Sequence, residues 1–152
     1  MCRVIICGGR DYRFDGSDTL WLDAFHKEFR LKEVITGAAN GADTGGYNWA
    51  RKTGIDCVRF DANWEKYKKS AGAIRNKKML LYLLSRDMRD IYGSQDIGVI
   101  AFAGGPGTAN MVSLAQKEGV IVYHAFIPLN NKRWTAAHGL LTDEEYTEKF
   151  GE

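Results

Sequence analysis

Three glycine-rich segments of the sequence each follow an apolar run and carry residue types that suit phosphate binding. They are Gly8-Gly9-Arg10, residues 36–41 (Thr-Gly-Ala-Ala-Asn-Gly) and residues 104–108 (Gly-Gly-Pro-Gly-Thr). Glycine lets a backbone approach a ligand closely. The second and third segments lead into expected helices, whose first N–H groups and partial positive charge favour a phosphate. Strand-to-helix turns also use glycine for purely structural reasons, so each segment taken singly leaves both interpretations open.

Arg75 and Asn76 form a second cluster with possible binding chemistry. We expect them at the start of a helix over 74–84, where a cation is mildly unfavourable against the helix dipole. The planar guanidinium suits phosphate or carboxylate, so this placement favours a binding role for Arg75. Lys77 and Lys78 are typical of a solvated helix face.

Asp43 and Trp64 each allow two interpretations. Asp43 precedes an expected helix over 43–52, which it either caps or leaves free to accept hydrogen bonds from a ribose or a base. Trp64 lies in a polar stretch, 61–73, that we expect to be an ordered loop. Its indole is either a lid packed on the core or a surface on which a base stacks.

Other kinds of chemistry find little support in the sequence. No segment continues into the Gly-Lys-Ser/Thr of a P-loop, and no G-x-G-x-x-G occurs. The three histidines are scattered, and the three cysteines contain no C-x-x-C. We therefore name no catalytic residue, and we expect no metal and no cofactor.

The elements that must position these residues alternate regularly along the chain. Short apolar runs alternate with helical patterns, which is typical of a parallel sheet covered on both faces. The sequence predicts an α/β fold, a Rossmann-like three-layer sandwich with a mostly parallel sheet of five or slightly more strands. Ligands bind such sheets at the carboxyl ends of the strands, so the glycine segments should meet there. The expected strands are 4–7, 34–35, 56–60, 97–102 and 120–123. Besides the helices already described, we expect a helix that Ser17 or Asp18 caps and another over 108–117.

Length, charge and hydropathy limit the classes of function. The 152 residues suffice for one domain, which we place at 3–126, with a C-terminal extension over 127–152 that ends in a short helix near 143–150. A net charge of +2 argues against nucleic acid as a partner. No apolar stretch approaches the roughly 20 residues of a membrane span, and the first apolar run is too short for a secretory signal. We therefore expect a cytoplasmic protein that binds no membrane.

The order of these motifs from about residue 3 to 125 resembles the YspA-like, cpYpsA-related branch of the SLOG superfamily. This resemblance implies a Rossmann-like domain that binds a nucleotide or nucleotide-derived small molecule, as a sensor or a sponge, and that forms homo-oligomers. We nominate Trp21, Tyr92 and Trp134 for contacts between copies, and each of them could equally lie in the core. The ligand-binding residues that we expect are Gly8, Gly9, Arg10, Thr36, Gly37, Gly41, Asp43, Trp64, Arg75, Asn76, Gly104, Gly105, Gly107 and Thr108.

Relatives in this superfamily supply two alternatives to simple binding. The LOG phosphoribohydrolases cleave nucleoside monophosphates and carry a carboxylate soon after a Gly-Thr pair. Here Thr108 is followed by Ala109, Asn110 and Met111, so an acid would have to come from Asp43 or from a partner subunit. The DprA proteins process DNA, and the near-neutral charge argues against that function. We therefore expect binding rather than catalysis.

Overall fold

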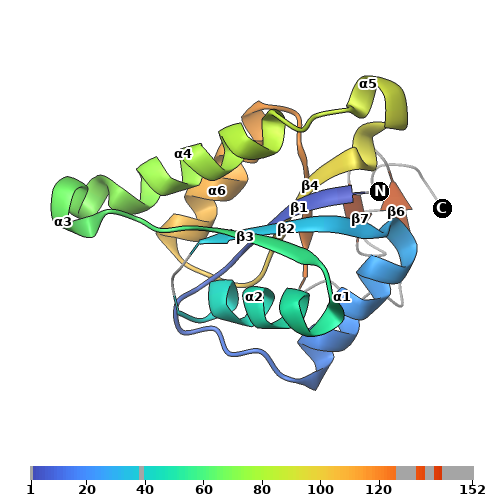
Figure 1. The fold of residues 1–152 in the computed structure, drawn as a ribbon, viewed down its shortest axis with the longest axis horizontal. Coiled ribbons are helices and arrows are strands. Elements are labelled where there is room, and N and C mark those ends of the chain that lie inside the picture. Colours follow the sequence, from blue (N-terminus) through green and yellow to red (C-terminus); the bar gives the residue numbers. More distant parts are fainter. Residues whose placement is uncertain (1, 38–39, 126–132, 136–138, 142–152) are drawn as a thin grey trace.

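The computed structural model of the chain describes residues 2–37, 40–125, 133–135 and 139–141. Five parallel strands form the central sheet, in the order β3-β2-β1-β4-β5. Helices cover both of its faces, with α1 and α2 on one side and α4 and α6 on the other (Figure 1). The predicted Rossmann-like α/β sandwich is therefore confirmed. The strands are β1 (Cys2–Cys7), β2 (Leu31–Gly37), β3 (Asp56–Phe60), β4 (Ile97–Ala101) and β5 (Ile121–His124), and the helices named here are α1 (Gly16–Phe29), α2 (Ala42–Thr53), α4 (Ala71–Leu84) and α6 (Pro106–Lys117).

The strand order determines where a ligand site can form. The chain builds outward from β1 through β2 to β3, then returns across the sheet to β4 on the other side of β1. Strands β1 and β4 pair in parallel, and Cys7 lies opposite Ala101 at their carboxyl ends. The loops leaving these two strands turn toward opposite faces, which opens a crevice between them.

The core is divided by the sheet into two halves. Val4 and Ile6 point to the side of α1 and α2, whereas Ile5 and Cys7 point to the side of α4 and α6. This alternation follows the two-residue period of a strand. Because β1 is buried on both faces, it appears in the sequence as a continuous apolar run. Leu22, Phe25 and Trp49 fill the first half, and Met79, Leu83 and Met111 fill the second.

The start of α1 differs from our prediction. Asp15, and not Ser17 or Asp18, is the capping residue. Its Oδ1 accepts hydrogen bonds from the backbone N–H groups of Ser17 and Asp18 at 2.8 and 3.2 Å, and the Asp18 carboxylate accepts one from the Asp15 N–H at 2.9 Å. Asp18 therefore completes a reciprocal capping box at the third helical position.

The segment from 61 to 73, expected to be a loop, contains short helical elements. Helix α3 (Trp64–Tyr67) leads into a 3-10 turn, η1 (Lys68–Ser70), and α4 begins directly after it at Ala71. Arg75 consequently lies one turn inside α4 and not at its start, so the argument from the helix dipole weakens for this residue. Helix α6 likewise begins at Pro106, earlier than expected. The connection from 85 to 96 contains α5 (Arg89–Tyr92) and η2 (Ser94–Asp96).

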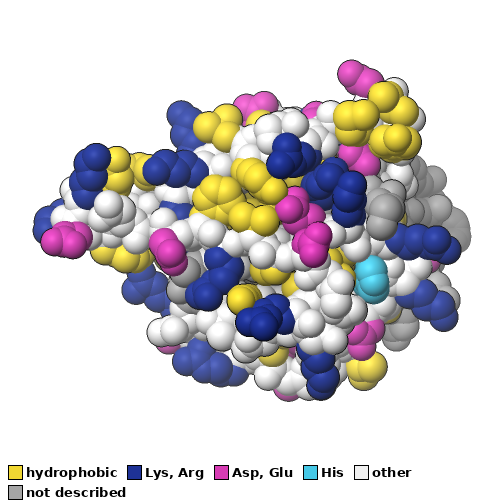
Figure 2. Space-filling model, viewed as in Figure 1, with side chains coloured by type: hydrophobic (Ala, Val, Ile, Leu, Met, Phe, Trp, Pro, Cys, Tyr) yellow, Lys and Arg dark blue, Asp and Glu magenta, His cyan; other side chains and the backbone are white. Residues whose placement is uncertain are grey.

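Our nominated contact residues have different surroundings. Trp21 is buried and stacks on Phe25 with ring centroids 5.6 Å apart, so of the two alternatives for this residue the core position is the one observed. Ile91 and Tyr92 of α5 are 68% and 66% exposed, and Figure 2 shows hydrophobic side chains gathered over this helix. The side chain of Trp134 lies outside the described part of the chain.

Near the C-terminus, β6 (Arg133–Thr135) and β7 (Gly139–Leu141) pair antiparallel. The expected helix near 143–150 lies outside the described residues, and the boundary at 126 stays a prediction. Among the helices that the structure describes, none has the length and apolar character needed to cross a bilayer.

Candidate functional site

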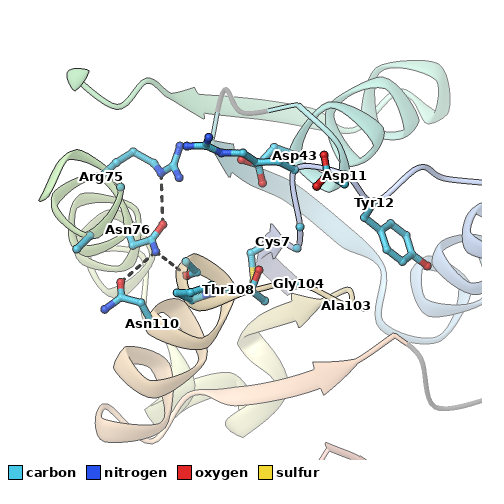
Figure 3. Close-up of a pocket in the computed structure, with 18 of the residues that line it drawn as sticks. Cys7, Asp11, Tyr12, Asp43, Arg75, Asn76, Ala103, Gly104, Thr108 and Asn110 are labelled. Atoms are coloured by element: carbon cyan, nitrogen blue, oxygen red, sulfur yellow. Dashed lines mark hydrogen bonds between the residues drawn. The ribbon is translucent and has the colours of Figure 1, made fainter. Parts of the chain in front are cut away.

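A cavity of about 870 Å³ opens at the carboxyl ends of β1 and β4. Its walls come from the loop after β1, the loop after β4 with the first turns of α6, and the N-terminal half of α4. Figure 3 shows the labelled side chains of Asp43 and Arg75 approaching from α2 and α4, with Thr108 and Gly104 on the α6 side. The cavity therefore lies at the switch in strand order, where parallel sheets bind ligands.

Gly9 joins all three neighbouring loops through its backbone. Its N–H donates to the Ala103 carbonyl at 2.9 Å, and its own carbonyl accepts from Ala42 and Tyr12 at 3.1 and 3.2 Å. Gly41, just before α2, has a φ of +78°, and a Cβ there would overlap the carbonyl oxygens of Gly9 and Arg10. Glycine is therefore required at position 41 both for its dihedral angle and for the close packing of these loops.

The loop after β4 presents the start of α6 to the cavity. A Cβ on Gly104 would lie 2.7 Å from the Gly9 nitrogen and would overlap the Thr108 hydroxyl, so two backbones meet tightly here. Pro106 occupies the first turn of α6, and no side chain of the described residues caps this end. The N–H groups of Gly107 and Thr108 have no intrahelical acceptor, and both residues line the cavity. This arrangement suits an anion.

Asn76 connects two helices of the site through hydrogen bonds of its side-chain amide. It is 4% exposed, and its Nδ2 donates to the Gly107 carbonyl and to Oδ1 of Asn110, both at 3.0 Å. Its own Oδ1 accepts a hydrogen bond from Nε of Arg75 at 3.3 Å. The amide thus links α4 to the first turns of α6 and orients the Arg75 side chain.

Arg75 and Asp43 lie close together above the end of β2. A Cβ on Gly37 would lie 2.6 Å from Oδ2 of Asp43 and would overlap the Arg75 guanidinium. Asp43 is 5% exposed. The carboxylate can accept hydrogen bonds from a ligand, and the neighbouring guanidinium can donate them. This part of the cavity can therefore bind both donors and acceptors of a ligand.

Cys7 lies on the floor of the cavity as an unreactive thiol. Burial is the main cause that raises its pKa to about 12, Asp43 raises it further, and Arg75 opposes the shift. Because the thiolate is the nucleophilic form, Cys7 stays protonated and inert near neutral pH.

Most of the site residues that we predicted meet at this cavity. Three of them do not line it. Thr36 is fully buried within β2, Gly37 lies beneath Arg75 and Asp43, and Gly41 packs against Gly9, so these residues form the support behind the wall. Those that line the cavity are Gly8, Gly9, Arg10, Asp43, Trp64, Arg75, Asn76, Gly104, Gly105, Gly107 and Thr108.

Several lining residues were missed by the sequence analysis. Lys69 brings a further cation, and Asp11 and Tyr12 extend the first loop. Gly72 and Ala73 line the cavity from α4, and Asn110 does so from α6. The run of small residues at 71–73 was the available signal, because small side chains on a helix leave room beside it. Among the described residues, no group of three or more His, Cys, Asp or Glu side chains is arranged to hold a metal ion.

Comparison with known proteins supports part of this picture. Residues 2–67 match the sequence model of the YspA, cpYpsA-related SLOG family, YAcAr. The match runs from β1 through α3, and it therefore includes the first two glycine segments, Asp43 and Trp64. No curated protein and no solved structure matches the chain.

Proposed function

We propose that this chain, whose residues 2–67 match the YspA, cpYpsA-related SLOG family, binds a small nucleotide-derived molecule in the cavity at β1 and β4. The observation that carries the proposal is the meeting of an uncapped helix start, two glycine loops and Arg75 around one cavity. Each of these features is common alone, and together they offer a phosphate both backbone donors and a guanidinium.

The phosphate of the ligand lies at the start of α6 in this proposal. Gly107 and Thr108 donate their N–H groups, and the Thr108 hydroxyl is a further donor. Arg75 approaches from α4, held by its hydrogen bond to Asn76. Gly8, Gly9 and Gly105 leave room for the phosphate to reach the backbone.

The sugar of the ligand lies beside Asp43. Its carboxylate accepts hydrogen bonds from ribose hydroxyl groups, as acidic residues do in other nucleotide-binding α/β domains. Arg75 stays within reach of both the carboxylate and the phosphate, so the same pair orients two parts of the ligand.

Binding is better supported than glycosidic cleavage. The amide of Asn110 occupies the wall soon after the Gly-Thr pair, and its Oδ1 already accepts a hydrogen bond from Asn76. An amide cannot protonate a leaving base. Nucleic-acid binding is less well supported, because Lys and Arg side chains are interspersed with acidic ones over the face that Figure 2 shows.

The test begins with native mass spectrometry of freshly purified protein, followed by denaturation and identification of any small molecule released. Titration calorimetry with AMP, ADP and inorganic phosphate then measures affinity directly. Arg75→Ala should weaken binding of phosphorylated probes at least tenfold, because a charge-assisted contact is lost.

Lys77→Ala is the matched control for Arg75→Ala. Lys77 is an exposed cation on the same helix and does not line the cavity. Unchanged affinity in Lys77→Ala together with weakened affinity in Arg75→Ala supports a specific phosphate contact. A protein that carries no nucleotide-like molecule and binds none of the three probes would overturn the proposal.

Two further expectations accompany this function. Self-association, which the family resemblance implies, is tested by sedimentation velocity. A cytoplasmic location is tested by cell fractionation.

A further inference from the structure

Trp64 presents a large aromatic surface at the rim of the cavity. It is 46% exposed, and none of the described residues of α3 is buried. Its position is set by local backbone structure, because Oδ1 of Asn63 caps this short helix by accepting from the Lys66 N–H at 3.0 Å. The indole is therefore held at the rim without being needed to fill the core.

The neighbours of Trp64 leave it accessible from the cavity. Gly72 of α4 lies beside the ring, where a Cβ would be in ordinary van der Waals contact with Cη2 at 3.5 Å. Ala73 follows, and both small residues line the cavity. The guanidinium of Arg10 lies over the ring, with its Cζ 5.1 Å from the centroid. Arg10 is itself exposed and lines the same cavity.

We propose that Trp64 is the nucleobase platform of the cavity, and that a base stacks on the indole in place of the Arg10 guanidinium. The proposal rests on the phosphate-binding function above and adds that the ligand must carry an aromatic base. A sugar phosphate or inorganic phosphate fills only part of the site.

Replacement of the Arg10 guanidinium by a base on the Trp64 indole should lower the free energy of the complex. A base stacked on an aromatic side chain contributes more than a cation held over a ring at a solvent-exposed position. The displaced Arg10 guanidinium can form charge-assisted hydrogen bonds with the phosphate, and these compensate for its lost contact with the Trp64 ring. Stacking is also tolerant of the identity of the base, so both purine and pyrimidine nucleotides should benefit.

The test compares two probes that differ only by the base. Titration calorimetry measures the affinities of AMP and ribose 5-phosphate for the full chain, and their ratio isolates the contribution of the base. In the wild-type protein we expect AMP to bind about 5- to 100-fold more tightly, the range that one base–aromatic stack supplies. In Trp64→Ala this ratio should fall to about 1, and in Trp64→Phe it should stay intermediate because a smaller ring remains.

Two controls separate stacking from general damage. Tyr92→Ala removes another exposed aromatic side chain, on α5 away from the cavity, and should keep the wild-type ratio. Thermal unfolding of Trp64→Ala checks the fold. As an independent readout, the indole N–H signal of Trp64, assigned in an NMR spectrum by its loss in Trp64→Phe, should shift with AMP and not with ribose 5-phosphate.

The outcomes distinguish this inference from the proposed function. If ribose 5-phosphate binds as tightly as AMP to the wild type, or if the ratio survives in Trp64→Ala, phosphate binding stands and base stacking is overturned. If neither probe binds, the proposed function fails and the inference fails with it. A ratio that depends on Trp64, with a matching NMR shift, supports both.

Discussion

The side chain of Asn76 reaches across from α4 and donates a hydrogen bond to the backbone carbonyl of Gly107 at 3.0 Å. This contact fixes the distance between the helix that carries Arg75 and the helix whose start faces the cavity. The amide of Asn76, itself part of the cavity wall, therefore holds the two sides of the candidate phosphate site together. Substitutions of Asn76 should affect both folding and binding.

Replacing Asn76 by alanine should destabilise the protein by about 1–3 kcal/mol, because it removes two part-buried hydrogen bonds that join α4 to α6. Binding of a phosphorylated probe should weaken as well, since Arg75 loses its hydrogen bond to Oδ1. Urea unfolding and calorimetry measure the two effects. Lys77→Ala, the exposed neighbour on the same helix, should change neither by more than about 0.5 kcal/mol. An Asn76→Ala protein as stable as the wild type would show that these hydrogen bonds do not hold α4 and α6 together.

Gly41 and Gly54 differ in backbone conformation, with ψ of −127° and 23°, and in the room that each leaves for a side chain. Both have positive φ, but a Cβ on Gly54 would meet nothing within 4 Å, whereas one on Gly41 would overlap the Gly9 and Arg10 carbonyls. Gly54→Ala should cost about 1–2 kcal/mol from the left-handed dihedral alone. Gly41→Ala should cost clearly more, and chemical denaturation measures both. Equal losses would show that the loops adjust without penalty.

The buried thiol of Cys7 should make stability depend on alkaline pH. Burial raises the folded-state pKa from 9.0 to about 12, so the folded protein holds its proton where the unfolded chain has lost it. Stability from this thiol is complete below about pH 9 and declines as the pH rises toward 12, by on the order of 1 kcal/mol at pH 10.

Urea unfolding at pH 7.5 and 10 tests this prediction. Cys7→Ala should lose less stability than the wild type between the two pH values, because one of the buried thiols is gone. Cys2→Ala should behave in the same way, since burial also raises the pKa of Cys2 to about 12, although it lies at the opposite end of β1 from the cavity. An identical pH dependence in the wild type and both variants would show that these thiols ionise freely.

The parts of this structure that follow local patterns were predictable from the sequence. Strands β1 and β4 are buried on both faces, so their continuous apolar runs identified them, and the glycines that follow marked the loops of the site. The start of α4 was missed because Gly72, between two alanines, disfavours a helix. Local patterns also left Trp21 open between a contact between copies and the core, because its burial depends on the packing of α1 against the sheet.

Contacts between distant residues were beyond such patterns. The bridge from Asn76 to Asn110 joins residues that are 34 positions apart, and nothing near either asparagine signals it. Nothing in the local sequence likewise indicates that Lys69 of η1 lines the cavity. The glycines identified where a ligand could reach the backbone, while the side chains that orient it required the fold.

We expect the protein to leave the glycosidic bond of nucleoside monophosphates intact. Cleavage requires a group that protonates the departing base. The carboxylates lining the cavity are Asp11 and Asp43 among the described residues, and Asp43 lies close to the Arg75 guanidinium. We expect the Asp43 carboxylate to act as a hydrogen-bond acceptor for the ribose. Incubation with AMP, followed by chromatography, should therefore yield no adenine above the rate without protein. Adenine release that disappears in Asp43→Asn and persists in Lys77→Ala would instead identify Asp43 as the acid and the chain as a nucleotide N-glycosidase.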